Sequence, residues 1–463
     1  MTAFAWTDAA VRRALGLGDE PARADLAYAR ISTDSRTVGR GDLYVALVGE
    51  HHDGHRFVAD ALAKGARGAV VSRPVTTDAA APLYRVPDTL VALGSLAAHR
   101  RESVQVPVVG ITGSAGKTTT KELTRGALSG SLRVHATQAN LNNRIGMPMT
   151  LLAVPDDAEA VVLEMGTNEP GEISALARIA KPDVGVVITV GEAHLEKLGS
   201  LEGVLREKLD LLRNLTAGGR AAVGDEPDFL PDAARAACAS CTAVRVAGWS
   251  ARADESLRPS DVEVDASGAY RFLWRGQQVR LAVPGRHAVV DALLALAVAE
   301  LLGVPAGAAV AGVADVGAGS LRGEVRRLGD LTVVVDCYNA NPLSVRAALQ
   351  LLDAQQGVRR VAVLGTMLEL GAESRSLHAR SLGYALSLGI DLIVVTGGFA
   401  EAAAAVQDPR VVAAEDWRRA YAALRDRLTG NEIVLLKASR GVALEGILPL
   451  LEADFTTSRV GEA

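Results

Sequence analysis

The sequence predicts an α/β protein built from three domains. Its 463 residues suffice for about three domains of ordinary size, and 49% of them are hydrophobic, so large cores can form. Short apolar runs alternate with helical patterns, and each run ends in a polar or glycine-rich loop, as in parallel sheets. We expect a small α/β domain over residues 1–100, a central parallel sheet over 101–315 and a C-terminal doubly wound sheet over 316–463.

Charge and composition exclude several classes of partner. The formal net charge is −5 and no basic run stands out, which argues against a nucleic-acid partner. Aromatic residues make up only 4% of the chain, too few for a base-stacking platform. The first residues do not form a signal peptide, and no stretch of about 20 apolar residues could span a bilayer. We therefore expect a cytoplasmic protein with no transmembrane segment, acting as a monomer.

The cysteines favour the same compartment. Cys238, Cys241 and Cys337 are an odd number in a long chain, which predicts reduced thiols. Cys238 and Cys241 have the spacing of a zinc knuckle, but no second pair accompanies them. We interpret these two as ordinary residues at a helix end.

The first domain carries two polar loops between its short strands and helices. We expect a strand within 41–49, a helix over 57–65 and another strand at 68–71. One loop contains Ser35 and Arg36, which alone could be solvated surface groups. The other, residues 51–55, holds three histidines. A metal site is conceivable there, but Gly54 argues against one helix face, and we favour an ordinary surface loop.

A glycine-rich stretch follows the apolar strand at 108–111. Residues 112–118 read Thr-Gly-Ser-Ala-Gly-Lys-Thr, and a helical pattern begins at once. This layout predicts a phosphate-binding loop, in which backbone N–H groups and the positive end of the helix face an anion. Lys117 would reach the outer phosphates and the Thr118 hydroxyl would hold Mg²⁺. The full pattern has glycine where this chain has Ile111, so a glycine-rich turn without a ligand is the alternative.

Polar side chains follow two further apolar strands of the central region. Glu164 ends the strand that starts at residue 160, and His194 follows the strand at 184–190. The carboxyl ends of parallel strands form the crevice where such sheets bind ligands, so Glu164 is a candidate Mg²⁺ ligand. His194 could instead be a satisfied surface histidine. Lys208 lies on a helical pattern at 201–212, where a lone lysine is normally solvated.

Other stretches complete the outline. The asparagine-rich loop 140–148 suits either turn geometry or a polar ligand. Residues 244–284 predict a small antiparallel insertion, followed by an apolar helix at 288–302. In the last domain, the strands at 332–335, 361–364, 392–395 and 433–436 each run into a polar or glycine-rich loop.

Taken together, these loops resemble those of the Mur ligases over nearly the whole chain. The motifs that carry the resemblance are residues 34–36, 53–55, 112–118, 140–148, 164–168, 193–196 and 437–440. The most discriminating are Tyr-Asn-Ala-Asn-Pro at 338–342 and Glu-Leu-Gly at 369–371. They resemble the member that adds D-alanyl-D-alanine. A member adding diaminopimelate or lysine would show an Asp-Asn-Pro-Arg stretch.

The resemblance implies a fold and a reaction. The first domain would bind UDP, the central one would be a phosphate-loop ATPase-type sheet, and the last would be Rossmann-like. ATP would phosphorylate the free carboxylate of a UDP-N-acetylmuramoyl-tripeptide. The amine of D-alanyl-D-alanine would then attack the acyl phosphate, and phosphate would leave. Because negatively charged reactants meet, cations would dominate the site. The three domains would close around the ligands.

The resemblance also implies roles for individual residues. Lys117, Glu164, His194 and Lys208 would be the catalytic set. Two Mg²⁺ sites would involve Thr118, Glu164, His194 and Lys208, the last as a carbamate. ATP would contact Gly113, Ser114, Ala115, Gly116, Lys117, Thr118, Thr119, Asp291, Arg322, Asp336 and Asn339. Substrate contacts would come from Ser35, Arg36, Asn142, Asn143, Thr167, Asn168, Tyr338, Lys437 and Arg440, with Ser35 and Arg36 facing UDP.

Four positions depart from the family pattern. Ala288 and Asp291 stand where the family often has asparagine, and Val335 and Thr366 where it often has aspartate. An ionised Asp291 can accept a hydrogen bond from adenine but cannot donate one as asparagine does. Two alternative identifications remain, of which only the second is motivated by these departures. One is a folylpolyglutamate synthase, which lacks a first domain like residues 30–65. The other is a homologue that binds the UDP-linked peptide without catalysis.

Overall fold

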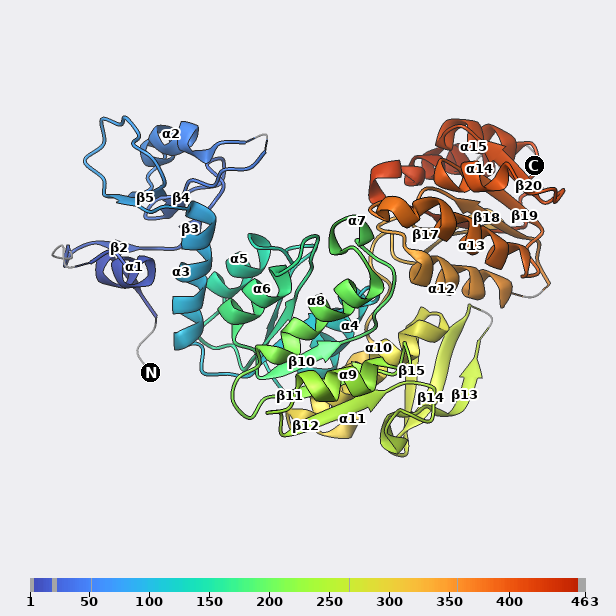
Figure 1. Ribbon diagram of the computed structural model, residues 1–463, viewed down its shortest axis with the longest axis horizontal. Helices are drawn as coiled ribbons and strands as arrows, with labels where there is room; N and C mark the ends of the chain where they lie inside the picture. Colours follow the sequence, from blue (N-terminus) through green and yellow to red (C-terminus); the bar gives the residue numbers. More distant parts are fainter. Residues whose placement is uncertain (1–3, 19–22, 51, 266, 356, 457–463) are drawn as a thin grey trace, which may run out of the picture.

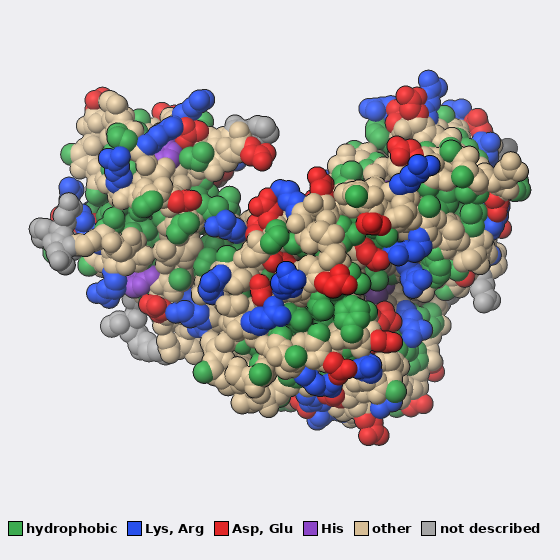
Figure 2. All heavy atoms as spheres, in the orientation of Figure 1, with side chains coloured by type: hydrophobic (Ala, Val, Ile, Leu, Met, Phe, Trp, Pro, Cys, Tyr) green, Lys and Arg blue, Asp and Glu red, His purple; other side chains and the backbone are tan. Residues whose placement is uncertain are grey.

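The computed structural model describes residues 4–18, 23–50, 52–265, 267–355 and 357–456. Figure 1 shows an N-terminal part, a central part and a C-terminal part arranged in sequence order, with the central part below and between the other two. The space-filling view shows a broad hollow between the N-terminal and C-terminal parts, with the central part as its floor (Figure 2). The predicted α/β class with parallel sheets is confirmed.

The N-terminal part holds a four-stranded parallel sheet in the order β3-β4-β5-β6 and a two-stranded ribbon, β1-β2. Its elements are β1 (Trp6–Thr7), α1 (Asp8–Leu15), β2 (Ala27–Tyr28), β3 (Ile31–Ser32), β4 (Leu43–Val45), α2 (Val58–Ala63), β5 (Gly68–Val71), β6 (Leu83–Arg85) and α3 (Thr89–Ser103). Helix α3 packs on α1 and also on α5 and α6 of the central part, so it links the two.

The loop with the histidines is held by its own hydrogen bonds. His55 is 4% exposed; its Nδ1 lies 2.9 Å from Asp53 Oδ1, and its Nε2 accepts from the Ser72 N–H at 2.9 Å. Both ring nitrogens therefore stabilise the loop, which favours the structural interpretation over a metal. No group of three or more His, Cys, Asp or Glu side chains that could hold a metal occurs among the described residues. His51 lies outside them.

The central part is built on a six-stranded parallel sheet, β12-β11-β10-β7-β9-β8. Its elements are β7 (Val108–Thr112), α4 (Lys117–Ser129), β8 (Val134–Ala136), α5 (Gly146–Leu152), β9 (Ala160–Glu164), α6 (Glu172–Ala180), β10 (Val184–Val187), α7 (Leu195–Leu198), α8 (Leu201–Arg213), β11 (Arg220–Gly224), α9 (Leu230–Ala237), β12 (Ala243–Ala247), α10 (Arg286–Leu301) and α11 (Ala306–Ala314). Strand β10 is shorter than predicted, and α10 begins two residues earlier.

The sequence of α10 is apolar because the helix is buried along most of its length between the sheet and α4. Helices α4 and α11 meet at two glycines. A Cβ on Gly126 would lie 2.4 Å from the Gly312 carbonyl oxygen, so no larger residue fits this crossing. The predicted antiparallel insertion is confirmed as the sheet β13 (Ser260–Val264), β14 (Ala269–Trp274) and β15 (Gln277–Pro284).

The C-terminal part is a doubly wound sheet in the order β16-β17-β21-β18-β19-β20, with only β16 antiparallel. Its elements are β16 (Glu324–Leu328), β17 (Leu331–Asp336), α12 (Pro342–Asp353), β18 (Arg360–Leu364), α13 (Ser374–Leu386), β19 (Leu392–Thr396), α14 (Gly398–Ala403), β20 (Val411–Ala414), α15 (Trp417–Arg425), β21 (Ile433–Lys437) and α16 (Leu448–Thr456). One apolar core lies under α12, α13 and α14, and another under α15 and α16. We propose the domain limits 1–100, 101–315 and 316–463 on the distribution of these sheets.

The prediction for two cysteines was wrong. Helix α9 ends at Ala237, and the following turn brings Cys241 back until its N–H donates to the Cys238 carbonyl oxygen at 2.9 Å. The two Cα atoms are 5.2 Å apart and the sulfurs form a disulfide. Cys337 is free and buried. The pair therefore gives no support to the expectation of reduced thiols.

Candidate active site

The predicted phosphate-binding loop has the geometry that the sequence suggested. Strand β7 ends at Thr112 and α4 begins at Lys117. Gly116 has a φ of 81°, and a Cβ there would lie 2.7 Å from Asp291 Oδ1, so glycine is required. Lys117 Nζ donates to the Gly113 carbonyl oxygen at 2.9 Å, and burial lowers the Lys117 pKa. The unpaired N–H groups of the first turn of α4 remain available for an anion.

Glu164 faces this loop from the neighbouring strand. It ends β9, pairs in register with Ile111 of β7, and is 1% exposed. The Thr118 hydroxyl donates to Glu164 Oε2 at 2.9 Å, and Asn142 Nδ2 donates to Glu164 Oε1 at 2.7 Å. The buried Glu164 carboxylate and the Thr118 hydroxyl therefore lie next to each other. Such oxygen donors are the ligands that Mg²⁺ prefers.

Lys208 is fully buried, and its Nζ has no hydrogen-bond partner among the described residues. The carboxylate of the adjacent Glu207 instead accepts from the N–H groups of Gly171 at 2.7 Å and Ile173 at 2.8 Å. Burial, reinforced by the charge of Lys117, holds the Lys208 pKa well below the usual value for lysine. The expectation of a solvated helical lysine is therefore wrong. A buried amine with a lowered pKa loses its proton easily, and the neutral amine can then react as a nucleophile.

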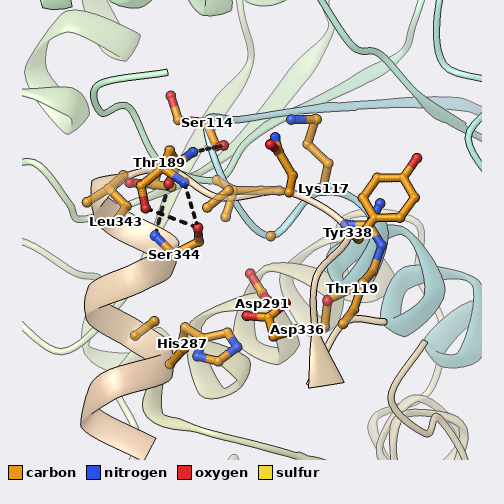
Figure 3. Close-up of a pocket in the computed structure, with 18 of the residues that line it drawn as sticks. Ser114, Lys117, Thr119, Thr189, His287, Asp291, Asp336, Tyr338, Leu343 and Ser344 are labelled. Atoms are coloured by element: carbon orange, nitrogen blue, oxygen red, sulfur yellow. Dashed lines mark hydrogen bonds between the residues drawn. The ribbon is translucent and has the colours of Figure 1, made fainter. Parts of the chain in front are cut away.

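Loops of the C-terminal part complete the site. His194 Nδ1 lies 2.5 Å from Glu369 Oε2, and this hydrogen bond lowers the pKa of Glu369. Asn341 caps α12 and donates through Nδ2 to the Ser114 carbonyl oxygen at 3.0 Å. Figure 3 shows the start of α12, at Leu343 and Ser344, against Ser114 and Thr189. The phosphate-binding loop is thus in direct contact with the C-terminal part.

Two charged clusters from the C-terminal part face the same space. Lys437 is 1% exposed, pairs with Asp336 at 2.8 Å and donates to the Asn339 carbonyl oxygen at 2.7 Å. The Arg322 guanidinium lies 3.7 Å from the centre of the Tyr338 ring. Arg322, Tyr338 and Lys437 thus add cationic and aromatic groups to the pocket that Lys117 also lines.

A pocket of about 740 Å³ joins these elements. The predicted residues that line it are Ser114, Ala115, Gly116, Lys117, Thr119, Asn142, Asn143, Glu164, Thr167, Asn168, His194, Asp291, Arg322, Asp336, Tyr338, Asn339 and Lys437. Gly113, Thr118 and Lys208 are not among the lining residues, although Thr118 contacts Glu164.

Three predicted substrate residues lie away from the pocket. Arg440 is exposed and pairs with Glu445 at 3.1 Å. Ser35 and Arg36 lie in the N-terminal part, where Arg36 pairs with Asp34 at 2.7 Å. Ala288, Val335 and Thr366 also do not line the pocket, so these departures do not remove a polar contact from its wall.

Three residues without a predicted role, Glu369, Arg286 and Trp249, also line the pocket. Glu369 had been noted only within a motif. Arg286 lies with its guanidinium 4.4 Å from the centre of the Trp249 ring, and both line the pocket. A cue for Arg286 existed, since it follows a glycine at the start of an apolar helix. The role of Trp249 had no cue in the sequence.

Asp291 is a buried acid rather than an exposed ionised one. It is 2% exposed, its Oδ1 accepts from the Thr120 hydroxyl at 3.0 Å, and its Oδ2 has no hydrogen-bond partner among the described residues. Burial raises the pKa of Asp291 to about 7. Once protonated, the carboxyl can both donate and accept, as asparagine does. The expectation that Asp291 cannot donate therefore holds only above about pH 7.

Asp291→Asn is expected to stabilise the folded protein increasingly as pH rises. The Asp291 pKa is raised from 3.8 to about 7, so the proton favours the folded state, and that contribution is lost as pH rises through about 7. The cost of the wild-type acid reaches on the order of 4 kcal/mol above that pH, and asparagine removes it while keeping the acceptor for Thr120. Thermal unfolding across a pH series measures the effect. A stability difference that does not change with pH would contradict it.

Comparison with known proteins now identifies the family. Residues 27–101 match the Mur ligase family catalytic domain, residues 111–299 the Mur ligase middle domain, and residues 321–440 the Mur ligase glutamate ligase domain. The chain belongs to the Mur ligase family.

Individual relatives extend over nearly the whole chain. The UDP-N-acetylmuramoyl-tripeptide–D-alanyl-D-alanine ligase of Bacillus subtilis is 34% identical, over 90% of this chain and 92% of that protein. A crystal structure of MurF from Acinetobacter baumannii superimposes with a TM-score of 0.89 at 32% identity, covering 98% of this chain and 100% of that one. MurF ligase from Thermotoga maritima, solved in complex with ADP, gives a TM-score of 0.82 at 27% identity, covering 94% and 99%.

Proposed function

We propose that this protein is an ATP-dependent ligase that joins D-alanyl-D-alanine to UDP-N-acetylmuramoyl-tripeptide, forming the pentapeptide precursor of peptidoglycan. One observation carries the proposal: the phosphate-binding loop and the 338–342 and 369–371 loops of the C-terminal part line one pocket. The relatives that bear this name align with nearly the whole of this chain, which supports the same assignment.

The chemistry proceeds in two steps. A carboxylate oxygen of the tripeptide attacks the γ-phosphorus of ATP, and ADP leaves with the electrons of the broken P–O bond. The amine of D-alanyl-D-alanine then attacks the acyl carbon, loses a proton, and the tetrahedral intermediate expels inorganic phosphate. Lys117 stabilises the negative charge on the transferred phosphoryl group, and Arg322 and Lys437 line the same pocket.

We propose that residues 113–119, Asp291, Arg322, Asp336 and Asn339 bind ATP. The positive end of α4 and the N–H groups of its first turn receive the phosphates. The buried Asp291 Oδ2, which has no hydrogen-bond partner among the described residues, supports a polar contact with the nucleotide. The lining of the pocket supports this assignment for all of these residues except Gly113 and Thr118, which belong to the same loop and helix start.

The residues present fit divalent cations. Thr118 and Glu164 offer hard oxygen donors for one Mg²⁺, and His194 with a carbamylated Lys208 would hold a second. Bound Mg²⁺ would neutralise charge on the phosphoryl oxygens. The observation that supports the carbamate is the buried, unpartnered Lys208 Nζ, since only a neutral amine adds CO₂. Carbamylation would convert the buried amine into an anion, which suits a metal ligand.

We propose that Ser35 and Arg36 anchor the UDP end, while Asn142, Asn143, Thr167, Asn168 and Tyr338 line the path of the peptide. The hollow in Figure 2 lies between the N-terminal and C-terminal parts, so a long substrate would extend from the N-terminal part to the pocket. Closure of the N-terminal part over the substrate would bring Arg36 toward the site. Arg440, in the C-terminal part, would also reach the substrate only after a movement of the domains.

No described helix is long and apolar enough to cross a bilayer. We further propose that the protein acts as a monomer in the cytoplasm.

The product tests the proposal. Purified protein is incubated with ATP, Mg²⁺ and UDP-N-acetylmuramoyl-tripeptide, and the amine donor is D-alanyl-D-alanine, D-alanine or L-glutamate. Mass spectrometry is expected to find the tripeptide extended by the dipeptide in one step, and no product with glutamate. Extension of a folate by glutamate would favour the folylpolyglutamate synthase instead. Substrate binding without any product would favour the homologue that lacks catalysis.

A further inference from the structure

A contact between the central and C-terminal parts of the chain holds His194, one of the site residues. His194 immediately precedes α7 in the central part, and Glu369 lies between β18 and α13 in the C-terminal part. Besides the 2.5 Å contact between their side chains, the Glu196 N–H donates to the Glu369 carbonyl oxygen at 3.1 Å. A Cβ on Gly371 would lie 2.9 Å from Glu196 Cα, so the two loops are in close contact.

Both residues adopt a backbone conformation that side chains disfavour. The φ angles of His194 and Glu369 are 55° and 64°, in the left-handed region. Such strain persists only where surrounding contacts impose it, and it concentrates at functional sites. Here it directs two side chains from different parts of the chain toward each other and toward the pocket that both line.

The hydrogen bond determines what the histidine offers. An ionised carboxylate only accepts, so the Nδ1 of His194 carries the proton toward Glu369. The neutral ring then keeps its lone pair on Nε2. Metal-binding histidines are commonly oriented in this way by a carboxylate on the other ring nitrogen.

We propose that Glu369 is the positioning residue for His194, so that the C-terminal part completes the second metal site by fixing the ring orientation and the tautomer of a ligand in the central part. The inference rests on the proposed function, because it takes His194 as a metal ligand. It adds that metal binding requires the C-terminal part to be docked.

A second contact between the same two parts supplies a matched control. Arg380 on α13 pairs with Glu192 at 2.7 Å, and neither residue lines the pocket. Arg380→Gln removes an ion pair between the two parts without touching His194. Glu369→Ala removes the carboxylate, and Glu369→Gln keeps an oxygen that can accept from Nδ1.

Two readouts test the proposal. With a non-hydrolysable ATP analogue present, Mn²⁺ titration followed by EPR is expected to show Glu369→Ala weakening the weaker class of site by about 10- to 100-fold, with Glu369→Gln in between and Arg380→Gln unchanged. Without metal, ¹⁵N chemical shifts of the His194 ring at alkaline pH are expected to show the Nδ1–H tautomer in the wild type and its loss in Glu369→Ala.

Wild-type Mn²⁺ affinity in Glu369→Ala, or an equal loss in Arg380→Gln, would overturn the proposal. So would an unchanged tautomer in both Glu369 variants. If the wild type forms the pentapeptide product, and Glu369→Ala keeps the wild-type Mn²⁺ affinity and His194 tautomer, only the positioning role fails. If the wild type binds no Mn²⁺ beside the nucleotide analogue, the proposed metal site fails as well.

Discussion

Lys117→Ala is expected to lower the ligase rate by about 10²- to 10³-fold while leaving the fold intact. The Nζ of Lys117 makes one hydrogen bond within the described part of the chain, to the Gly113 carbonyl oxygen, so its removal disturbs little of the structure. The loss falls on the reaction, because the transferred phosphoryl group loses one of the cations that stabilise its charge. Steady-state rates together with circular dichroism and thermal unfolding measure both effects.

Lys197→Ala is the control for general loss of positive charge. Lys197 is half exposed and pairs with Glu169 on the surface. Ion pairs on the surface contribute little to the stability of the fold, so the activity of Lys197→Ala should remain close to wild type. Near-normal activity in Lys117→Ala would show that the glycine-rich turn is not a phosphate site.

Lys208→Ala is expected to lower activity by about 10²-fold or more, and added short carboxylates such as acetate should restore part of it. The side chain is fully buried, so its removal leaves a cavity that a small anion can enter. The restored anion would take the place of the proposed carbamate. The measurement is the ligase rate against carboxylate concentration.

Lys208→Met separates the charge from the packing. Methionine fills similar volume and removes a buried nitrogen that has no hydrogen-bond partner among the described residues, so stability should not fall. Activity should be as low as in Lys208→Ala, and acetate should not restore it, because no cavity opens. Full activity in either variant would show that Lys208 serves only the packing of α8.

The phosphate-binding loop and the strand ends could be predicted because their signals are local. A glycine-rich turn between strand and helix is written in consecutive residues, and Glu164 lies near it because β9 is the neighbour of β7. Parallel strands place their carboxyl ends at one edge, so candidate ligands converge there without further information.

Contacts between distant loops could not be predicted in this way. His194 and Glu369 are 175 residues apart and meet only because the C-terminal part is docked on the central one. Asn341 lies in the 338–342 motif of the sequence, but only the structure shows that it caps α12 and donates to the Ser114 carbonyl oxygen. The raised pKa of Asp291 and the lack of a hydrogen-bond partner for Lys208 Nζ among the described residues depend on burial by several elements, which no short pattern encodes.

The cysteine prediction failed for a related reason. The spacing of Cys238 and Cys241 was read correctly as a helix end, but the direction of the following turn brings the sulfurs together. Counting cysteines gives no information on that turn.

Phosphate release from ATP tests the central claim most directly. Initial rates are measured with Mg²⁺ in four mixtures: no peptide substrate, UDP-N-acetylmuramoyl-tripeptide alone, D-alanyl-D-alanine alone, and both. The account predicts sustained release only when both are present, because the dipeptide amine must consume the acyl phosphate before another turnover. Equal release in all four mixtures, or none in any, would contradict the assignment of this chain as the dipeptide-adding ligase.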